Sequence, residues 1–331
     1  MNRLILTLVA ILAVALTGCT SPTTPTNSTG MPAPTIGLTY IPNVQFSPFY
    51  VAETEGAYTK AGVKPVLRHH GTSEGLFTAL VSGNEQFVVA GGDEVLQARS
   101  QGMDLLAVAA YYRTYPVELI VPEASAIKSL ADLKGKTIGL PGKYGESWFA
   151  LLVALGSAGL TEADVTVAEI GYTQVAALTT GKVDAIVGFS NNDAVQFALA
   201  GTAVRGLPIS SGTVPLVPTT LVTTTSYAKA NPEVVKAVVA ATMAGISSVV
   251  ADQANAMKVS ANYVPDLTTA AGAKAAEATL AATVPLWTTA DGSVDPTLDS
   301  QQWVAMADFM AQQKLTTSRQ DPNLAMSNAF H

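Results

Sequence analysis

The order of the secondary-structure signals constrains this chain more than any other feature. From Thr35 onward, short runs rich in β-branched and apolar residues alternate with longer helical patterns, most of which end at a glycine. The expected strands are 35–40, 63–69, 87–90, 105–110, 117–121, 137–140, 165–170 and 185–187. The expected helices are 48–61, 73–81, 93–101, 145–158, 173–180 and 193–200. This order predicts an α/β fold with mostly parallel sheets covered on both faces by helices.

Two segments of the chain resemble each other. Residues 79–97 and 177–196 each contain the end of a helix, a glycine, a buried strand, an acidic loop and a further helix. They predict two similar α/β lobes, although such units look alike in many α/β proteins. Ligands of open α/β sheets lie beyond the carboxyl ends of the strands, so two facing lobes predict a cleft between them.

Composition excludes several classes of protein. With 48% hydrophobic and 13% charged residues, a chain of 331 residues is expected to form about two globular domains. A net charge of -7 leaves no basic surplus for phosphates, so we expect no nucleic-acid partner. One cysteine and three histidines are too few for the usual metal sites or for Cys/His catalysis. We therefore expect no metal, no cofactor and no catalytic residue.

The N-terminus has the features of an export signal. Arg3 is followed by the apolar run 4–15, which is too short to span a bilayer, and then by Leu-Thr-Gly-Cys at 16–19. This box resembles a bacterial lipoprotein signal, which implies a signal peptide at 1–18 and lipidation of Cys19; the alternative is a plain secretory signal. Residues 19–34 are uncharged and rich in Pro, Ser and Thr, which predicts a flexible tether.

The loops that follow the expected strands gather aromatic and amide side chains. These loops are 40–49, 70–73, 91–94, 111–115, 141–148 and 189–193. Aromatic faces supply stacking area and amides read the edge of a ring, which suits a planar heterocycle. The candidate ligand-binding residues are Tyr40, Asn43, Phe46, His70, Glu94, Tyr112, Tyr144, Trp148, Asn191, Asn192 and Asp193.

Each candidate also has a structural alternative. Some of the rings can fill the core, and the spacing of Trp148 places it on the buried stripe of its helix. The acids Glu94 and Asp193 can cap the helices that begin beside them. Arg113 is the one arginine in the predicted site loops, so a strongly anionic ligand is possible but not favoured.

Several motifs carry a family resemblance. Tyr-Ile-Pro-Asn at 40–43, Ser-Pro-Phe-Tyr-Val-Ala at 47–52, Asp-Glu-Val-Leu-Gln-Ala at 93–98 and the stretch 130–139 resemble the solute-binding proteins of ABC importers for nitrate, sulfonates and vitamin precursors. The resemblance implies a two-lobed type II periplasmic-binding-protein fold with a ligand cleft between the lobes. We expect lobe 1 to contain 35–120 and 217–331 and lobe 2 to contain 121–216, with chain crossings near 119–122 and 211–218.

The resemblance also implies a function. Residues 170–178 and 187–196 look most similar to riboflavin-binding members, and other members bind thiamine-precursor pyrimidines. We expect a monomeric, extracytoplasmic, lipid-anchored receptor that binds riboflavin or a hydroxymethylpyrimidine and delivers it to an ABC permease. The family's pyrimidine-making enzymes carry a cysteine-rich iron motif, whereas this chain has no cysteine after Cys19. The alternatives are a receptor for nitrate or an alkylsulfonate, an extracytoplasmic enzyme acting on a heterocycle, and a surface lipoprotein that contacts other proteins.

Overall fold

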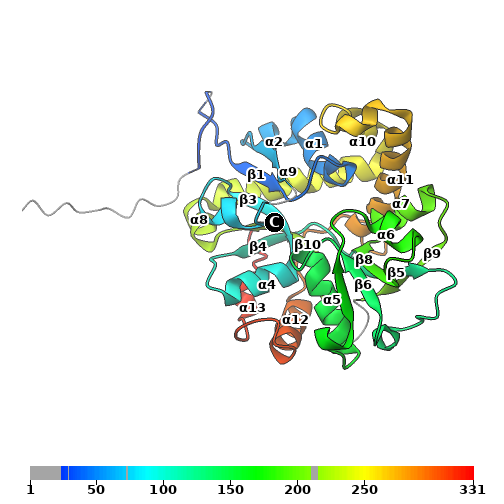
Figure 1. Ribbon diagram of the computed structural model, residues 1–331. Helices are drawn as coiled ribbons and strands as arrows, with labels where there is room; N and C mark the ends of the chain where they lie inside the picture. The colour runs from blue at the N-terminus through cyan, green and yellow to red at the C-terminus, as the bar shows by residue number, and fades with distance from the viewer. Residues whose placement is uncertain (1–23, 29, 72–73, 210–214) are drawn as a thin grey trace, which may run out of the picture.

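Two five-stranded sheets form the framework of the protein, each flanked by helices (Figure 1). The structure is a computed structural model that describes residues 24–28, 30–71, 74–209 and 215–331. The first sheet has the order β2 (Val66–His69), β1 (Thr35–Leu38), β3 (Phe87–Gly91), β10 (Thr219–Thr223), β4 (Leu106–Ala110). The second has the order β7 (Thr166–Glu169), β6 (Thr137–Leu140), β8 (Ala185–Phe189), β5 (Val117–Pro122), β9 (Val204–Pro208).

Both sheets are mixed, which corrects the expectation of mostly parallel sheets. In the first sheet β1 pairs in parallel with β2 and β3, whereas β10 is antiparallel to β3 and β4. In the second, β6 is parallel to β7 and β8, whereas β5 is antiparallel to β8 and β9. A helical crossover keeps successive strands parallel, whereas β5 enters from the other sheet through residues 111–116, which form no helix. Strand β10 also enters from the other sheet. The α/β fold class itself is confirmed.

The chain passes from one sheet to the other twice between β4 and β10. The first passage lies in residues 111–116, because β4 belongs to the first sheet and β5 to the second. It therefore comes earlier than the expected 119–122. The second passage lies within 209–218, of which 210–214 are outside the described residues.

The two sheets are built alike. Strands β1 and β6 carry the same four residues, Thr-Ile-Gly-Leu, and both occupy the second place in their sheets. Ile36 pairs with Phe87 on β3, and Ile138 pairs with Ala185 on β8. The similar segments 79–97 and 177–196 lie at corresponding places on these two sheets.

The helices follow the expected pattern in the first 200 residues, with two differences. The helix expected at 48–61 is two helices, because Gly56 takes a left-handed φ of 75° between them. The helix expected at 73–81 begins at Thr78, and residue 73 is outside the described residues. The helices are α1 (Ser47–Thr54), α2 (Ala57–Lys60), α3 (Thr78–Val81), α4 (Gly92–Ser100), α5 (Gly145–Ser157), α6 (Gln174–Thr179), α7 (Asp193–Leu199), α8 (Thr225–Ala230), α9 (Pro232–Ala251), α10 (Gln253–Ser260), α11 (Ala270–Trp287), α12 (Ser300–Gln312) and α13 (Pro322–Ala325).

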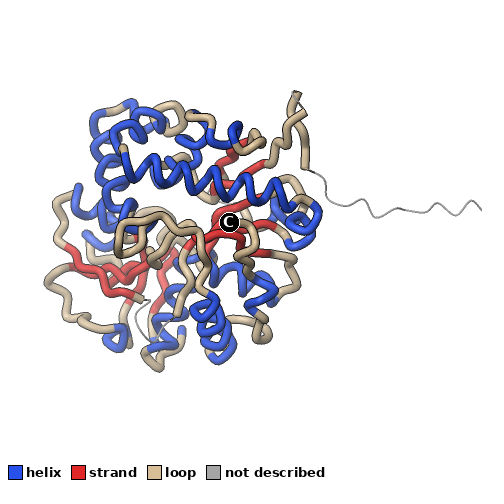
Figure 2. The backbone as a smooth tube through the Cα atoms, turned by 180° about the vertical axis from the view of Figure 1, so that it is seen from behind, coloured by secondary structure: helices blue, strands red, loops and turns tan. Residues whose placement is uncertain are grey.

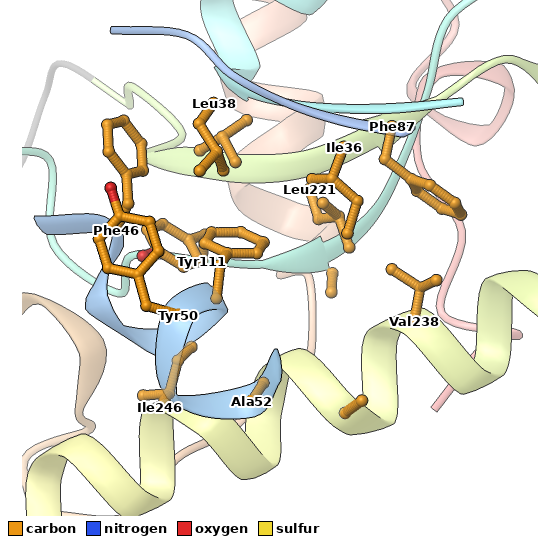
Figure 3. Close-up of a cluster of buried hydrophobic side chains, with 14 of the residues drawn as sticks. Ile36, Leu38, Phe46, Tyr50, Ala52, Phe87, Tyr111, Leu221, Val238 and Ile246 are labelled. Atoms are coloured by element: carbon orange, nitrogen blue, oxygen red, sulfur yellow. The ribbon is translucent and has the colours of Figure 1, made fainter. Parts of the chain in front are cut away.

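The largest apolar core lies between the first sheet and helices α1 and α9 (Figure 3). Ile36 and Leu221 from the sheet meet Val238 and Ile246 from α9, and all four are buried. Gly245 allows α9 to approach α1 closely, since a Cβ built there would lie 2.1 Å from the carbonyl oxygen of Pro48. Burial of this apolar surface is the main stabilising contribution to the lobe.

Helix α9 is long and apolar enough to cross a membrane by length and composition alone, and it is the only such helix among the described residues. Half of its apolar window is buried inside the protein, and it packs on α1 and α2. Figure 2 shows it from behind as a long helix lying against the body. Its apolar character is that of a core helix.

The N-terminal segment departs from expectation where the structure describes it. The carbonyl oxygens of Pro32 and Pro34 accept hydrogen bonds from the backbone of Lys64 and Val66, beside the edge strand β2. Residues 32–34 of the expected tether therefore pack on the body, where they extend the parallel pairing of β1 with β2 toward the N-terminus. The expected signal peptide at 1–18 and Cys19 lie outside the described residues.

Candidate ligand-binding site

A cavity of about 1320 Å³ lies between loops of the two sheets. All six loops expected to form the site contribute to its wall. Tyr40, His70 and Tyr112 come from the first-sheet side, and Tyr144 and Asp193 come from the second. The rule that ligands lie beyond strand ends therefore located this cavity from the sequence.

Nine aromatic side chains contribute to the wall of the cavity. Its lining includes Tyr40, Phe46, Phe77, Tyr111, Tyr112, Tyr144, Phe149, Tyr172 and Phe189. The rings of Tyr40 and Tyr172 belong to different sheets and lie 6.0 Å apart between centroids. Tyr144 and Tyr172 are about half exposed. The cavity thus offers several flat faces, some of them at its open side, for stacking with a planar ligand.

Eight of the eleven candidate ligand-binding residues line the cavity. These are Tyr40, Phe46, His70, Glu94, Tyr112, Tyr144, Asn192 and Asp193. Asn43, Trp148 and Asn191 are not among its lining residues.

The three remaining candidates have structural contacts instead. Asn43 accepts a hydrogen bond from the backbone of Gln45 and so caps a short 3-10 helix, Val44–Phe46. Trp148 packs against the core of the second sheet, as its helical spacing indicates, with the Lys143 ammonium 5.5 Å from its ring. Asn191 is buried and donates a hydrogen bond of 3.0 Å to Thr283 on α11.

His70 is held in place from behind by a buried carboxylate. Its Nε2 lies 2.9 Å from Oε1 and 3.1 Å from Oε2 of Glu85, whose side chain is fully buried. Arg68 donates to the same carboxylate at 2.6 Å and to Glu74 at 2.7 Å. Because Nε2 is engaged with Glu85, Nδ1 is the ring nitrogen left to meet a ligand.

Glycine at position 37 makes room for this carboxylate. A Cβ built at Gly37 on β1 would lie 2.3 Å from Oε2 of Glu85, far inside van der Waals contact. The orientation of His70 at the cavity thus depends on a glycine in the adjacent strand.

Buried carboxyls lie along the cavity without a basic partner. Burial raises the pKa of Glu94 to about 8 and that of Asp193 to about 6. Burial, together with the charges of Asp93 and Glu94, raises the pKa of Glu146 well above its usual value. These groups are poised to carry protons near neutral pH, so they can donate as well as accept hydrogen bonds.

The cavity has no basic side chain other than His70 among its described lining residues. Arg113 is turned away to the segment after α11, where its guanidinium donates to the carbonyl oxygens of Asp295 and Thr297 and lies 3.7 Å from the Asp295 carboxylate. Four acidic residues do line the cavity, namely Glu74, Glu94, Glu146 and Asp193. A wall with no lysine or arginine among its described residues disfavours an anionic ligand.

Sequence reasoning missed Tyr172 and Glu146. Tyr172 follows strand β7, so the strand-end rule applies to it as it does to the six expected loops. Glu146 lies within the expected loop 141–148 but was not chosen as a candidate; an acid in the first turn of a helix usually serves the helix dipole. In the part of the chain that the structure describes, no group of three or more His, Cys, Asp or Glu side chains is placed to hold a metal ion.

Comparison with protein families and curated proteins gives consistent relatives. The NMT1/THI5-like family matches residues 43–256. Riboflavin-binding protein RibY of Chloroflexus aurantiacus is 31% identical, with 100% of this chain and 98% of that protein covered. The 4-amino-5-hydroxymethyl-2-methylpyrimidine phosphate synthase of Legionella pneumophila is 24% identical over 49% of this chain and 51% of the enzyme.

Solved structures confirm the two-lobed periplasmic-binding-protein fold. The alkanesulfonate-binding protein SsuA from Xanthomonas axonopodis, bound to MOPS, superposes with a TM-score of 0.67 at 25% identity, covering 89% of this chain and 98% of that chain. A Candida albicans protein with the generic periplasmic-binding-protein fold superposes with a TM-score of 0.64 at 14% identity, covering 90% and 97%.

Proposed function

Because the chain belongs to the NMT1/THI5-like family, we propose that it is the solute-binding protein of an ABC importer and that its ligand is a vitamin-type aromatic heterocycle. One observation carries this proposal: a cavity between the two sheets is lined by nine aromatic side chains and by no described lysine or arginine. A receptor of this kind binds by closing its lobes on the ligand and performs no chemistry.

Riboflavin is the ligand that the cavity favours. A volume of about 1320 Å³ exceeds the usual range of roughly 300–1,000 Å³, which suits a tricyclic ring with a polyhydroxyl chain. The full-length relative named as a riboflavin-binding protein supports the same ligand. A hydroxymethylpyrimidine, related to the product that the synthases are named for, is the second candidate and would leave more of the cavity empty.

The lining residues divide by chemistry into two roles. Tyr40, Tyr112 and Tyr144, with Phe46, offer faces for stacking on the ring system. His70, Glu94, Asn192 and Asp193 offer hydrogen bonds to the ring edge and to hydroxyl groups. Asn43, Trp148 and Asn191 have no place in this assignment, since none of them lines the cavity.

A small anion is the competing ligand, because sulfonate-binding proteins share the fold. Nitrate or an alkylsulfonate needs charged or strongly polar donors. The nearest expected cation, Arg113, instead binds carbonyl oxygens of another segment. The lack of a lysine or arginine among the described lining residues therefore argues against this alternative.

Ligand carried through purification is the direct test. The mature chain is purified without refolding, and native mass spectrometry followed by denaturation identifies any bound small molecule. Riboflavin is then titrated, with quenching of its fluorescence as the signal. Retention of a sulfonate, with no response to riboflavin, would replace the heterocycle by an anion.

Replacing Tyr40 by alanine is expected to weaken riboflavin binding by about 5- to 150-fold, because stacking and buried area worth roughly 1–3 kcal/mol are lost. Trp148→Ala is the matched control, since it removes a ring of the same kind outside the cavity. Arg113→Ala should change affinity little. Calorimetry of the three variants measures these changes in affinity. A dominant effect of Arg113→Ala would favour a small anion as the ligand.

We also propose that the protein is extracytoplasmic, monomeric and anchored through Cys19, so that it can deliver ligand to a permease in the membrane. The sulfonate-binding relative from Escherichia coli is described as periplasmic, which supports the location. The Leu-Thr-Gly-Cys box supports the anchor.

Changing Cys19 to serine is expected to release the mature protein from membranes into the soluble fraction. The expected loss is nearly complete, because α9, the one helix among the described residues that is apolar enough to span a bilayer, packs in the core. Cell fractionation with immunoblotting measures the distribution. Full membrane retention of the serine variant would contradict lipid anchoring.

A further inference from the structure

Three acidic side chains meet where helices α4 and α5 approach each other from the two lobes. Asp93 and Glu94 lie in the first turn of α4, and Glu146 lies in the first turn of α5. A Cβ built at Gly91 would lie 3.4 Å from Oε2 of Glu94 and 3.4 Å from Oε1 of Glu146. Carboxyl oxygens of the two lobes therefore flank the same point of the backbone.

The three carboxyls differ in the number of hydrogen bonds that their oxygens accept. Glu94 Oε2 accepts from the backbone N–H of Gly91 at 3.0 Å, and the backbone N–H of Glu146 also donates to the Glu94 carboxyl. Asp93 accepts from the hydroxyl of Tyr115 at 2.9 Å and from the backbone of Glu94 at 2.9 Å. Oε1 of Glu146 is buried without a hydrogen-bond partner. A buried carboxylate oxygen without a donor is costly, whereas a carboxylic acid is tolerated.

No cation compensates these charges. Within the described residues, no lysine or arginine forms an ion pair with Asp93, Glu94 or Glu146. The other titratable groups that face them are the phenols of Tyr112 and Tyr115, which are neutral at physiological pH. Like charges in a buried site cannot all ionise, so at least one proton is held there.

We propose that Glu94 and Glu146 form a proton-dependent latch, in which closing the lobes over the ligand takes up a proton from solvent and opening them releases it. The inference rests on the proposed ligand-driven closure of the cleft. When the lobes separate, water reaches both carboxyls and each ionises near its ordinary pKa. When the lobes meet, the carboxyls are buried together and at least one of them keeps a proton. Glu146 is thus a positioning residue for the closed state.

The sign of the pH dependence follows from the raised pKa values. Burial raises the pKa of Asp93 to about 6 and that of Glu94 to about 8, and the pKa of Glu146 is raised further by its acidic neighbours. The closed form therefore binds protons more tightly than the open form. Lower pH favours closure, and a pH above about 8 favours opening.

The latch can be tested on the ligand-free full chain by small-angle scattering. The radius of gyration is expected to be smaller at pH 5.5 than at pH 8.5. Glu146→Gln should remove the difference, because an amide is neutral at every pH, and Glu94→Gln provides a second variant. Glu162→Gln, an exposed carboxylate of the second lobe paired with Lys143, should retain the wild-type response.

Riboflavin titration adds a second readout. Calorimetry in buffers of different ionisation enthalpy is expected to show uptake of up to about one proton per ligand at neutral pH, and affinity should fall up to about tenfold per pH unit as the pH rises from neutral to about 8. Glu146→Gln should show neither effect. A wild-type radius that is independent of pH, or a Glu146→Gln variant that keeps the pH response, would overturn the latch. If riboflavin fails to bind, the ligand assignment fails while the scattering titration still decides the latch.

Discussion

Replacing Gly37 by alanine is expected to destabilise the protein by about 3–5 kcal/mol and to weaken ligand binding as well. The added methyl group would lie 2.3 Å from Oε2 and 2.6 Å from Cδ of Glu85. That carboxylate cannot move without leaving His70 and Arg68, and leaving a buried carboxylate without its partners costs about this much. Because His70 lines the cavity, its displacement is expected to lower the affinity for the ligand as well.

Urea unfolding and riboflavin titration measure the two effects of Gly37→Ala. The matched control is Gly139→Ala on β6, which stands in the same tetrapeptide at the corresponding place of the second sheet. Its new methyl group would meet side-chain methyls of Ile170 and Val183, which can shift, so a loss of roughly 1–2 kcal/mol with unchanged affinity is expected. Equal losses in both variants would show that the Glu85 carboxylate is not the cause.

Replacing Trp303 by alanine is expected to lower the free energy of unfolding by about 3–5 kcal/mol, because a large cavity opens in a closed core. Trp303 on α12 is fully buried and packs in an apolar cluster with Met306 and Met310. Its indole Nε1 has no hydrogen-bond partner. Trp303→Phe should therefore cost much less, because it keeps most of the ring and leaves no polar partner unsatisfied.

Chemical denaturation followed by circular dichroism compares the two Trp303 variants at constant pH. The quantity to compare is how much each substitution lowers the free energy of unfolding. If phenylalanine costs as much as alanine, then the indole N–H, and not the ring volume, carries the contribution.

Individual strands and helices could be predicted from the sequence where a local pattern of residues was enough to define them. Strand β6 was predicted at its observed bounds. Helix α5 was predicted to within one residue, because an apolar stripe and a closing glycine mark it. The direction of β10 could not be predicted in this way. Its antiparallel place between β3 and β4 depends on pairing across more than 100 residues, which no local pattern records.

The candidate site was predictable as a set of loops but less so as individual side chains. Trp148 and Phe149 are neighbours on α5, yet Trp148 packs on the core and Phe149 lines the cavity. Successive residues of a helix point about 100° apart, so the choice depends on how the helix rolls against its sheet. The helical period of Trp148 with Leu151 indicated the core, and this signal was more reliable than the aromatic character of its side chain.

The position of β10 also has a consequence for the synthesis of the protein. Strands β3 and β4 remain without their shared partner until Thr219–Thr223 has emerged, more than 100 residues after β4 ends. At about 5–20 residues per second this interval lasts roughly 6–20 s. During that time two strand edges with strongly apolar sequences are open to pairing with other chains. A nascent chain of this architecture is therefore expected to need protection by a chaperone until β10 emerges. Silent changes that slow translation between residues 111 and 218 should increase its aggregation.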